Sequence, residues 1–381
     1  MTFKTKGVFN FAQIGDIHVG HNRTPTIHVV SSLFQAFPDN LETAQLDAIF
    51  ITGDFFDRAL SLGDDQVYII RDWITKFLHM CAKYDIVVRV LEGTPSHDWK
   101  QSRLFPHLNL LTKANCDVVH VTQLSIEYIE KLGIHVLYIP DEWRPTCEQT
   151  WEDVQNELLA HGLEQVDYVV MHGAFPHQMP KNLHGKIEMH DPDRYMSICR
   201  HYIMIGHVHR FTIHKNILAA GSVDRLAQGE EEAKGHLRVK VRENGEDEIR
   251  FVENKNAKKY VTINCDGLTE AEAHAKIMKV VNKLPKQSYV CVKCRRDDPA
   301  AATAIHLSAV MTDYYWSVKD SKVVKAQNEE FMFNKNTIRK TSISLDPSNI
   351  VSLLMERIRK KTQYDHIALQ CHKVLEEIVS E

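Results

Sequence analysis

The sequence predicts an α/β protein built on a largely parallel or mixed β-sheet, followed by a second, smaller α+β domain. Two observations lead to this class. Over residues 8 to about 225, short apolar runs alternate with amphipathic stretches, the pattern of strands connected by helices. The chain also has 381 residues, which is long for one hydrophobic core, so two or three domains are expected.

Five of the apolar runs have the composition of buried strands. Each contains β-branched, aromatic or aliphatic residues and is bounded by glycine or polar residues, as expected for strands covered on both faces. The runs span residues 9–14, 48–52, 86–91, 168–171 and 202–205. Amphipathic segments between them, such as residues 64–83 and 149–161, predict helices that cover the sheet.

The pattern then changes to short alternating segments at residues 236–241 and 248–252. A turn-like connection joins them, so we expect an antiparallel hairpin that closes the first domain, residues 1–254. Residues 255–320 predict a small α+β domain that caps the first. Its expected strands are residues 260–265 and 288–295, and its expected helices are residues 269–284 and 299–314.

The last part of the chain differs from both domains. Residues 321–345 are polar and poorly periodic and predict a linker. Residues 346–381 predict a tail of two helices, the first with Asp346 as its N-cap and Pro347 in its first turn. One side of that helix is apolar and must pack on something, so a partner protein is expected there.

Composition limits the possible functions. Hydrophobic residues make up 44% and charged residues 25% of the chain, values typical of a globular protein. The net charge of −4 provides no general attraction to nucleic acid or acidic membranes, so a polyanion would need a local patch or a metal ion. No apolar run reaches the length of a membrane span, and the first ten residues lack a signal-peptide pattern. We therefore expect a cytoplasmic protein.

A short polar motif follows each of the five predicted strands. In an open α/β sheet, the loops at the carboxyl ends of the strands converge, so we expect the five motifs to meet in space. The motifs are Gly15-Asp16-Ile17-His18, Gly53-Asp54-Phe55-Phe56-Asp57-Arg58, Gly93-Thr94-Pro95-Ser96-His97-Asp98, His172-Gly173 and Gly206-His207-Val208-His209.

The side chains of these motifs indicate a metal site. Carboxylate oxygens and neutral imidazole nitrogens together suit divalent ions such as Mn²⁺, Fe²⁺, Zn²⁺ or Co²⁺. In Asp16-Ile17-His18, the two polar side chains are two residues apart and project to the same side of an extended backbone, and His207-Val208-His209 repeats this spacing. Each motif alone is common by chance. Their fixed order, always after a strand, favours metal binding.

This ordered set of D-x-H, GDxxDR, G…HD, H-G and GHxH resembles the calcineurin-like metallophosphoesterases. The resemblance implies a four-layer fold, a β-sandwich flanked by helices, that holds two metal ions. Mn²⁺ is the expected ion, with Mg²⁺, Fe²⁺, Zn²⁺ and Co²⁺ as alternatives. Two such ions polarise a phosphodiester and activate water as a nucleophile. The implied ligands are Asp16, His18 and His209 for the first ion, His172 and His207 for the second, and Asp54 as the bridge between both.

The third motif departs from the family pattern. The family usually has G-N-H-D/E, in which the Asn side-chain oxygen binds the second metal. Here Ser96 stands before the histidine, and the loop from Gly93 is two residues longer, so Ser96 is the expected but weaker ligand. By the same resemblance, His97 stabilises the transition state or protonates the leaving oxygen. Asp98 is expected to orient His97 by hydrogen bonding.

Within the superfamily, the chain is similar to the SbcD-type DNA repair nucleases, including their bacteriophage counterparts. The similarity lies in the segment after GHxH, residues 220–232, and in the order of domain, cap, linker and paired helices. It implies a Mn²⁺-dependent double-strand exonuclease and single-strand endonuclease. It also implies a homodimer that binds a coiled-coil ATPase of the SbcC type through the helical tail, in a bacterial or phage-infected cytoplasm.

In that family the cap contacts DNA, so basic residues of the cap are candidate phosphate contacts. They are Lys255, Lys258, Lys259, Lys293, Arg295 and Arg296. Two alternatives to a nuclease stay open. One is a phosphatase or cyclic-nucleotide phosphodiesterase of the same fold. The other is a non-catalytic scaffold subunit, in which Ser96 marks a weakened second metal site.

Overall fold

The computed structural model describes residues 8–61, 63–227, 229–295 and 298–321. The chain divides into two compact units, residues 1–321 and 322–381, and the described residues all belong to the first. Nearly all of the predicted linker, residues 321–345, and the whole predicted two-helix tail, residues 346–381, lie outside the described part. Arg296 of the predicted basic set also lies outside it.

The first sheet has six strands in the order β12-β11-β1-β2-β3-β4. Strands β1, β2, β3 and β4 are parallel, whereas β11 pairs antiparallel with β1, and β12 with β11. The predicted hairpin is therefore confirmed, and it extends this sheet. The bounds are β1 (Val8–Ile14), β2 (Ala48–Ile51), β3 (Val87–Leu91), β4 (Val118–Val121), β11 (Gly235–Arg242) and β12 (Glu248–Glu253).

The second sheet also has six strands, in the order β5-β6-β7-β8-β10-β9. Strands β6, β7, β8 and β10 are parallel, and the edge strands β5 and β9 pair antiparallel with their neighbours. Both sheets are thus mixed with a parallel centre, whereas the alternation of strands and helices alone predicts one largely parallel or mixed sheet. The bounds are β5 (Ser125–Ile129), β6 (Ile134–Ile139), β7 (Val166–His172), β8 (Cys199–Gly206), β9 (Thr212–His214) and β10 (Ile217–Ala219).

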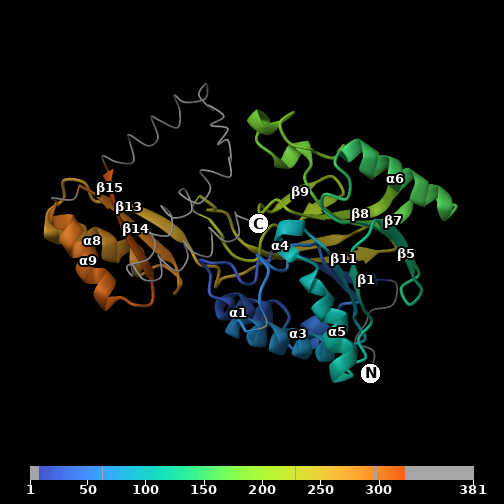
Figure 1. Ribbon diagram of the computed structural model, residues 1–381, viewed down its shortest axis with the longest axis horizontal. Helices are drawn as coiled ribbons and strands as arrows, with labels where there is room; N and C mark the ends of the chain where they lie inside the picture. Colours follow the sequence, from blue (N-terminus) through green and yellow to red (C-terminus); the bar gives the residue numbers. More distant parts are fainter. Residues whose placement is uncertain (1–7, 62, 228, 296–297, 322–381) are drawn as a thin grey trace, which may run out of the picture. The chain divides into compact units, whose positions relative to one another are not determined.

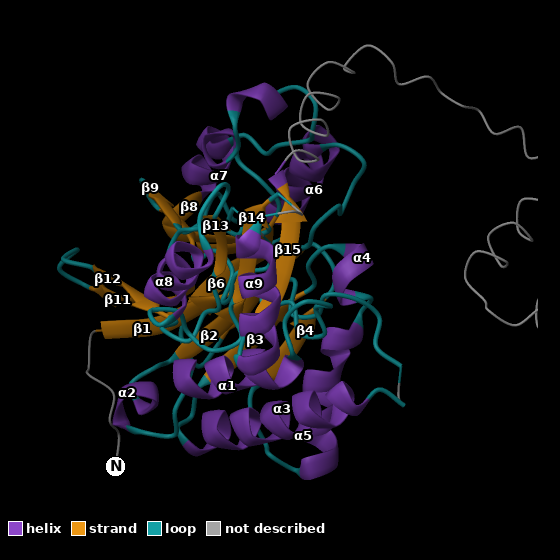
Figure 2. Ribbon diagram, turned by 90° about the vertical axis from the view of Figure 1, so that its left-hand side faces the viewer, coloured by secondary structure: helices purple, strands orange, loops and turns teal. Residues whose placement is uncertain are grey.

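Helices flank the two sheets (Figures 1 and 2). Three apolar clusters join these parts. One cluster packs α1, α3 and α5 on the first sheet, and another packs α6 and α7 on the second. The third combines Phe11 and Phe50 of the first sheet with Tyr168 and Met204 of the second. The predicted α/β class is confirmed at this level. The bounds are α1 (Thr26–Ala36), α3 (Asp65–Lys83), α5 (Leu104–Thr112), α6 (Cys147–Ala160) and α7 (Pro192–Ile198), with short helices α2 (Leu41–Ala44) and α4 (Pro95–Asp98) in loops.

The small α+β region beyond the hairpin has a parallel sheet in the order β13-β14-β15, with its own apolar cluster against two helices. Its helix α8 begins where the sequence predicts, because the Thr269 side chain and Glu272 form a capping box. Strand β15 was not predicted. The bounds are β13 (Tyr260–Asn264), α8 (Glu270–Val281), β14 (Tyr289–Cys294), α9 (Pro299–Val310) and β15 (Tyr315–Asp320). Within the described ranges, no helix combines the length and apolar character needed to span a membrane.

His236 of β11 makes the stability of the first sheet depend on pH. Burial, reinforced by the charges of Arg238 and Arg250, lowers the pKa of His236 from 6.5 to about 3. The folded state keeps this imidazole neutral, whereas the unfolded chain protonates it. The free energy of unfolding therefore keeps its full value above pH 6.5 and decreases as the pH falls below it. Between pH 7 and pH 5 this loss is about 2 kcal/mol.

We therefore expect His236→Gln to reduce the difference in unfolding free energy between pH 7 and pH 5 by about 2 kcal/mol. Urea unfolding of the chelator-treated protein at both pH values measures this difference. The exposed His161 provides the control, and His161→Gln should leave the difference as in the wild type. Equal pH dependence in all three proteins would contradict the assignment.

Candidate metal centre

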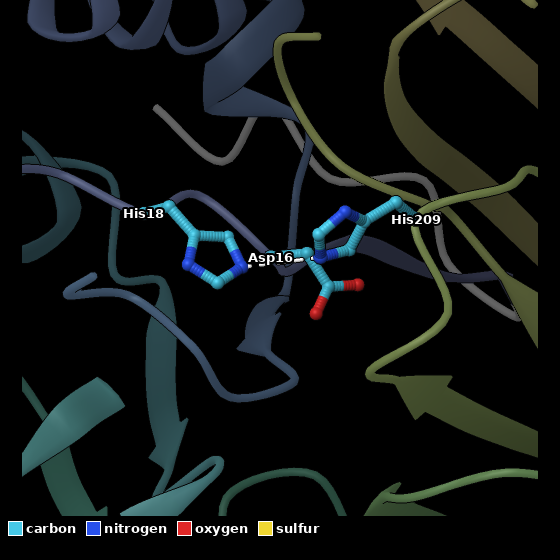
Figure 3. A group of neighbouring side chains, drawn as sticks. All are labelled: Asp16, His18 and His209. Atoms are coloured by element: carbon cyan, nitrogen blue, oxygen red, sulfur yellow. Dashed lines mark hydrogen bonds between the residues drawn. The ribbon is translucent and has the colours of Figure 1, made fainter. Parts of the chain in front are cut away.

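Six of the seven predicted metal ligands, all except Ser96, lie at the ends of strands of both sheets and come together in two groups. In the first group, Asp16 and His18 follow β1, and His209 follows β8 (Figure 3). Their candidate ligand atoms all lie within 4.8 Å of one another. The Nε2 atoms of His18 and His209 are 3.2 Å apart, so at most one proton fits between two atoms that would both bind a cation.

The second group contains Asp54, His172 and His207, whose candidate ligand atoms also lie within 4.8 Å of one another. Asp54 connects the two groups. Its Oδ2 atom is 3.4 Å from His172 Nε2 and 3.7 Å from His18 Nε2. The six residues are therefore divided into the two sets that the sequence resemblance implies, with Asp54 between them.

The backbone around these residues adopts conformations that favour glycine. Asp16, His18, Asp54 and His207 have φ angles of 47°, 52°, 50° and 93°. Each non-glycine residue in such a region costs about 1–3 kcal/mol, and such strain is typical of functional sites. Gly53 has a φ of 92°, and a Cβ atom there would lie 2.3 Å from His172 Nδ1. The turn after β2 therefore requires glycine to bring Asp54 and His172 together.

Neighbouring groups orient the imidazoles of the centre. His172 Nδ1 donates to the Thr52 carbonyl over 2.6 Å, which leaves Nε2 directed at Asp54. His18 Nδ1 faces Asp57 Oδ1 at 3.2 Å, and His209 Nδ1 faces Glu230 Oε1 at 3.4 Å. Carboxylate and carbonyl partners of this kind fix the ring orientation and raise the basicity of metal-binding histidines.

The charges in the centre fit a divalent cation. Burial alone would raise the pKa of Asp54, but the charge of His172 and its hydrogen bond hold that pKa below its usual range. Asp16 Oδ1 accepts from the His207 backbone N–H, whereas the buried Asp16 Oδ2 has no hydrogen-bond partner among the described residues. A buried carboxylate oxygen without a partner, beside two imidazole nitrogens, is a donor set that suits Mn²⁺ and related ions.

The structure places Thr94, rather than Ser96, at the second group. Thr94 Oγ1 is 3.2 Å from Asp54 Oδ2 and 3.5 Å from His172 Nε2. Ser96 is exposed in the short helix α4, and its carbonyl accepts a hydrogen bond from Trp99. The sequence-based expectation for Ser96 is corrected by this geometry. The two extra residues follow the ligand position instead of preceding it, so the residue next to Gly93 remains at the centre.

Thr94→Val is expected to weaken the binding of the second Mn²⁺ by about tenfold or more, because valine keeps the shape but removes the hydroxyl. Ser96→Ala removes a hydroxyl from the same loop and should leave both Mn²⁺ affinities unchanged. Titration of the metal-free protein, with free Mn²⁺ followed by electron paramagnetic resonance, compares the two variants. A loss in Ser96→Ala without a loss in Thr94→Val would restore Ser96 as the ligand.

His97 lies at the edge of the centre and is accessible. Its ring packs edge-on against His18 with centroids 4.9 Å apart, and its side chain is 36% exposed. Asp98 does not orient it. Instead, the buried Asp98 carboxylate accepts from the backbone N–H groups of Asp54, Phe56 and Gly93. The nearest described carboxylate is that of Asp57, whose Oδ1 is 4.0 Å from His97 Nδ1.

Asp98 therefore joins the loops after β2 and β3. Burial and the neighbouring charge of Asp54 raise the pKa of Asp98 to about 7, although its backbone hydrogen bonds lower it. The expectation for Asp98 was wrong because the turn of α4 directs its side chain into the interior.

Three carboxylates of the centre were assigned no role from the sequence. Asp57 was part of a quoted motif, and Glu230 lay in the segment after GHxH. Asp141 lay in no motif, although it follows the apolar strand β6 just as the predicted ligands follow theirs. Its carboxylate contacts Thr94 and His207. Hydrogen bonds from these groups, with the charge of His172, lower the pKa of Asp141 to about 2 despite its burial. A search for polar residues just after β6, like the search after the other strands, would have identified Asp141.

The predicted basic set of the cap is only partly available to a ligand. Lys258 is buried, and its Nζ donates to Thr24 Oγ1 and to the Arg23 carbonyl. Burial lowers the pKa of Lys258 to about 8. Its inclusion as a DNA contact was therefore wrong, because it anchors the cap to the loop after β1. Arg295 pairs with Asp298, whereas Lys255 and Lys259 are exposed and Lys293 is partly exposed.

A cavity of about 620 Å³ opens beside the second group. Asp141, Gly173 and His207 form its wall next to the ligands, and Trp143 and His190 are among its other lining residues. The centre thus adjoins a space large enough for part of a substrate.

Comparisons with known proteins do not identify the chain. No family model matches it, and no curated protein matches it. Among solved structures, TT1561 of Thermus thermophilus is matched over 99% of its length and 64% of this chain, at 10% identity and a TM-score of 0.37. A second solved chain is matched over 100% of its length and 64% of this chain, at 10% identity and a TM-score of 0.39. Likenesses this low carry no argument about function.

Proposed function

We propose that the protein is a two-metal phosphodiesterase that cuts DNA. The observation that carries this proposal is the position of Asp54 Oδ2 within 4 Å of nitrogens from both groups, 3.7 Å from His18 and 3.4 Å from His172. A shared carboxylate between two histidine-rich groups is the arrangement expected for a pair of ions that act on one phosphate. Asp16 Oδ2, which has no hydrogen-bond partner in the described part of the chain, supports a cation in the first group.

Each side chain has a distinct role in this proposal. Asp16, His18 and His209 would hold the first ion, His172 and His207 the second, and Asp54 both. Two bound ions would supply Lewis-acid activation of the phosphodiester and of water. Asp57 orients His18, and Glu230 orients His209, because each carboxylate faces the Nδ1 atom of the ring. His97 donates a proton to the leaving oxygen, a role that its 36% exposure and its position beside His18 allow.

The substrate class and the assembly rest on the resemblance of the ordered motifs to SbcD-type nucleases. We propose double-strand exonuclease and single-strand endonuclease activities with Mn²⁺, within a four-layer metallophosphoesterase fold. The partner would be a coiled-coil ATPase of the SbcC type, and the nuclease would act as a dimer. The cavity beside His207 provides room for the substrate next to the cut phosphate.

A substrate panel tests this proposal. The metal-free protein is assayed with and without Mn²⁺ on linear duplex DNA, single-stranded circular DNA, bis-p-nitrophenyl phosphate, a cyclic nucleotide and a phosphopeptide. We expect Mn²⁺-dependent cutting of both DNAs and slow turnover of the chromogenic diester. Preference for the phosphopeptide or the cyclic nucleotide would refute the nuclease. Mn²⁺ binding without activity on any of these substrates would favour a non-catalytic scaffold subunit. Assays repeated with a copurified coiled-coil ATPase, with and without ATP, test the proposed partner.

A further inference from the structure

Asp141 faces the second group, and among the described residues no lysine or arginine forms an ion pair with it. Its Oδ2 atom is 3.0 Å from Thr94 Oγ1 and 3.5 Å from His207 Nδ1, and its side chain is 11% exposed. In the part of the chain that the structure describes, its one ion-pair partner is His207. A largely buried carboxylate needs a compensating charge, and the imidazole beside it supplies one only while it is protonated. A cation supplies that charge when the imidazole is neutral, so these surroundings point to a cation.

The hydroxyl of Thr94 cannot satisfy both carboxylates that surround it. Thr94 Oγ1 lies within hydrogen-bond distance of Asp54 Oδ2 at 3.2 Å and of Asp141 Oδ2 at 3.0 Å. A hydroxyl has one hydrogen, so it can donate to only one of them at a time. The other carboxylate then faces the lone pairs of the Thr94 hydroxyl oxygen. A cation would remove this conflict, because it can bind both carboxylates and the hydroxyl oxygen together.

The position of Asp141 also corresponds to what the Gly93 loop lacks. In the family that the motifs resemble, an Asn amide oxygen after this glycine binds the second ion. Here that residue is Thr94, whose hydroxyl is a weaker ligand. Asp141 places a charged oxygen next to this hydroxyl from the end of β6, on the side of the cavity.

We propose that Asp141 is a ligand of the second ion, together with Asp54, His172 and His207, and that its carboxylate replaces the missing Asn amide. This inference rests on the proposed two-metal function. It gives the second site one more carboxylate oxygen than the family pattern, and oxygen-rich sites favour Mn²⁺ and Mg²⁺ over ions that prefer nitrogen and sulfur. The second ion is then held firmly despite the threonine.

Mn²⁺ binding to the full chain tests the assignment without relying on activity. Metal-free protein is titrated with Mn²⁺, and the free ion is followed by electron paramagnetic resonance. We expect two ions per wild-type chain. In Asp141→Ala the affinity for the second ion should fall by at least about tenfold, while the first ion binds as before. Asp167→Ala is the matched control, because this carboxylate is 15% exposed and paired with Arg200 at the opposite end of β7. It should bind both ions normally.

Asp141→Asn provides a second variant of the same shape. Its amide oxygen can still bind an ion but carries no charge, so the second affinity should fall less than in Asp141→Ala. Circular dichroism of the metal-free variants establishes that each is folded. Unchanged affinity in Asp141→Ala overturns the proposal, and if that variant does not fold, unchanged affinity in Asp141→Asn does so. A wild-type chain that binds two ions but cleaves no phosphodiester would refute the proposed function while the ligand assignment stands.

Discussion

Asp54→Asn should reduce Mn²⁺-dependent phosphodiester cleavage by about a thousandfold or more and weaken both metal sites together. Asp54 Oδ2 is the described carboxylate oxygen within 4 Å of histidines from both groups, at 3.7 Å from His18 and 3.4 Å from His172. Two ions contribute several kcal/mol of charge stabilisation in the transition state, and each 1.4 kcal/mol corresponds to a tenfold rate. Asparagine keeps the size but loses the charge that both ions need.

The measurement combines cleavage of linear duplex DNA with Mn²⁺ titration of the same preparation. The control is Asp167→Asn, a carboxylate on the second sheet that pairs with Arg200 away from the centre. It should retain full activity and two bound ions. Loss of a single ion in Asp54→Asn would show that Asp54 belongs to one site and is not shared.

His97→Ala should lower cleavage by about 100- to 10,000-fold and leave the affinities for both Mn²⁺ ions unchanged. His97 is close enough to the centre to reach a bound substrate, since its ring lies 4.9 Å from that of His18. The two groups that contain Asp16 and Asp54 do not include His97. The loss should be smaller for a substrate with a good leaving group, such as bis-p-nitrophenyl phosphate, because this leaving group does not need a proton.

His161→Ala is the matched control for this variant, since its side chain is 41% exposed, close to the 36% of His97, and it lies at the end of α6. Equal losses on DNA and on the chromogenic diester would assign His97 to transition-state charge stabilisation instead of proton donation. Loss of one Mn²⁺ in His97→Ala would make it a ligand, consistent with its place in a third group with His18 and Asp57.

The strands and most residues of the candidate centre could be predicted because they depend on local patterns. The run before Asp16 was predicted as residues 9–14, and β1 spans Val8–Ile14. The hairpin of β11 and β12 was predicted equally well from alternation, and the helix expected at residues 269–284 is α8, whose N-terminus the structure shows to be closed by a capping box. Strand β15 was missed, because Tyr315–Asp320 has only weak apolar alternation and is held by pairing with β14.

Side-chain direction in the Gly93 loop could not be predicted. Ser96 and Asp98 were given ligand and orienting roles from the resemblance of their motif to the family pattern, but the turn of α4 exposes the first and buries the second. Lys258 was treated as a surface charge, although its ammonium group is buried against Thr24. For Asp98 and Lys258, the decisive contacts come from residues elsewhere in the sequence, on surfaces that exist only after folding.

The sequence by itself therefore determined the α/β class, the order of the strands along the chain and a set of Asp and His residues at their ends, because periodicity and turn chemistry are local. Only the tertiary structure decided which of these side chains share a centre. It joined Asp54 to both groups, replaced Ser96 by Thr94 and brought Asp141 to the second group. The physical reason is that hydrogen bonding and metal coordination require distances of a few ångströms between loops from two different sheets, and sequence spacing does not encode those distances.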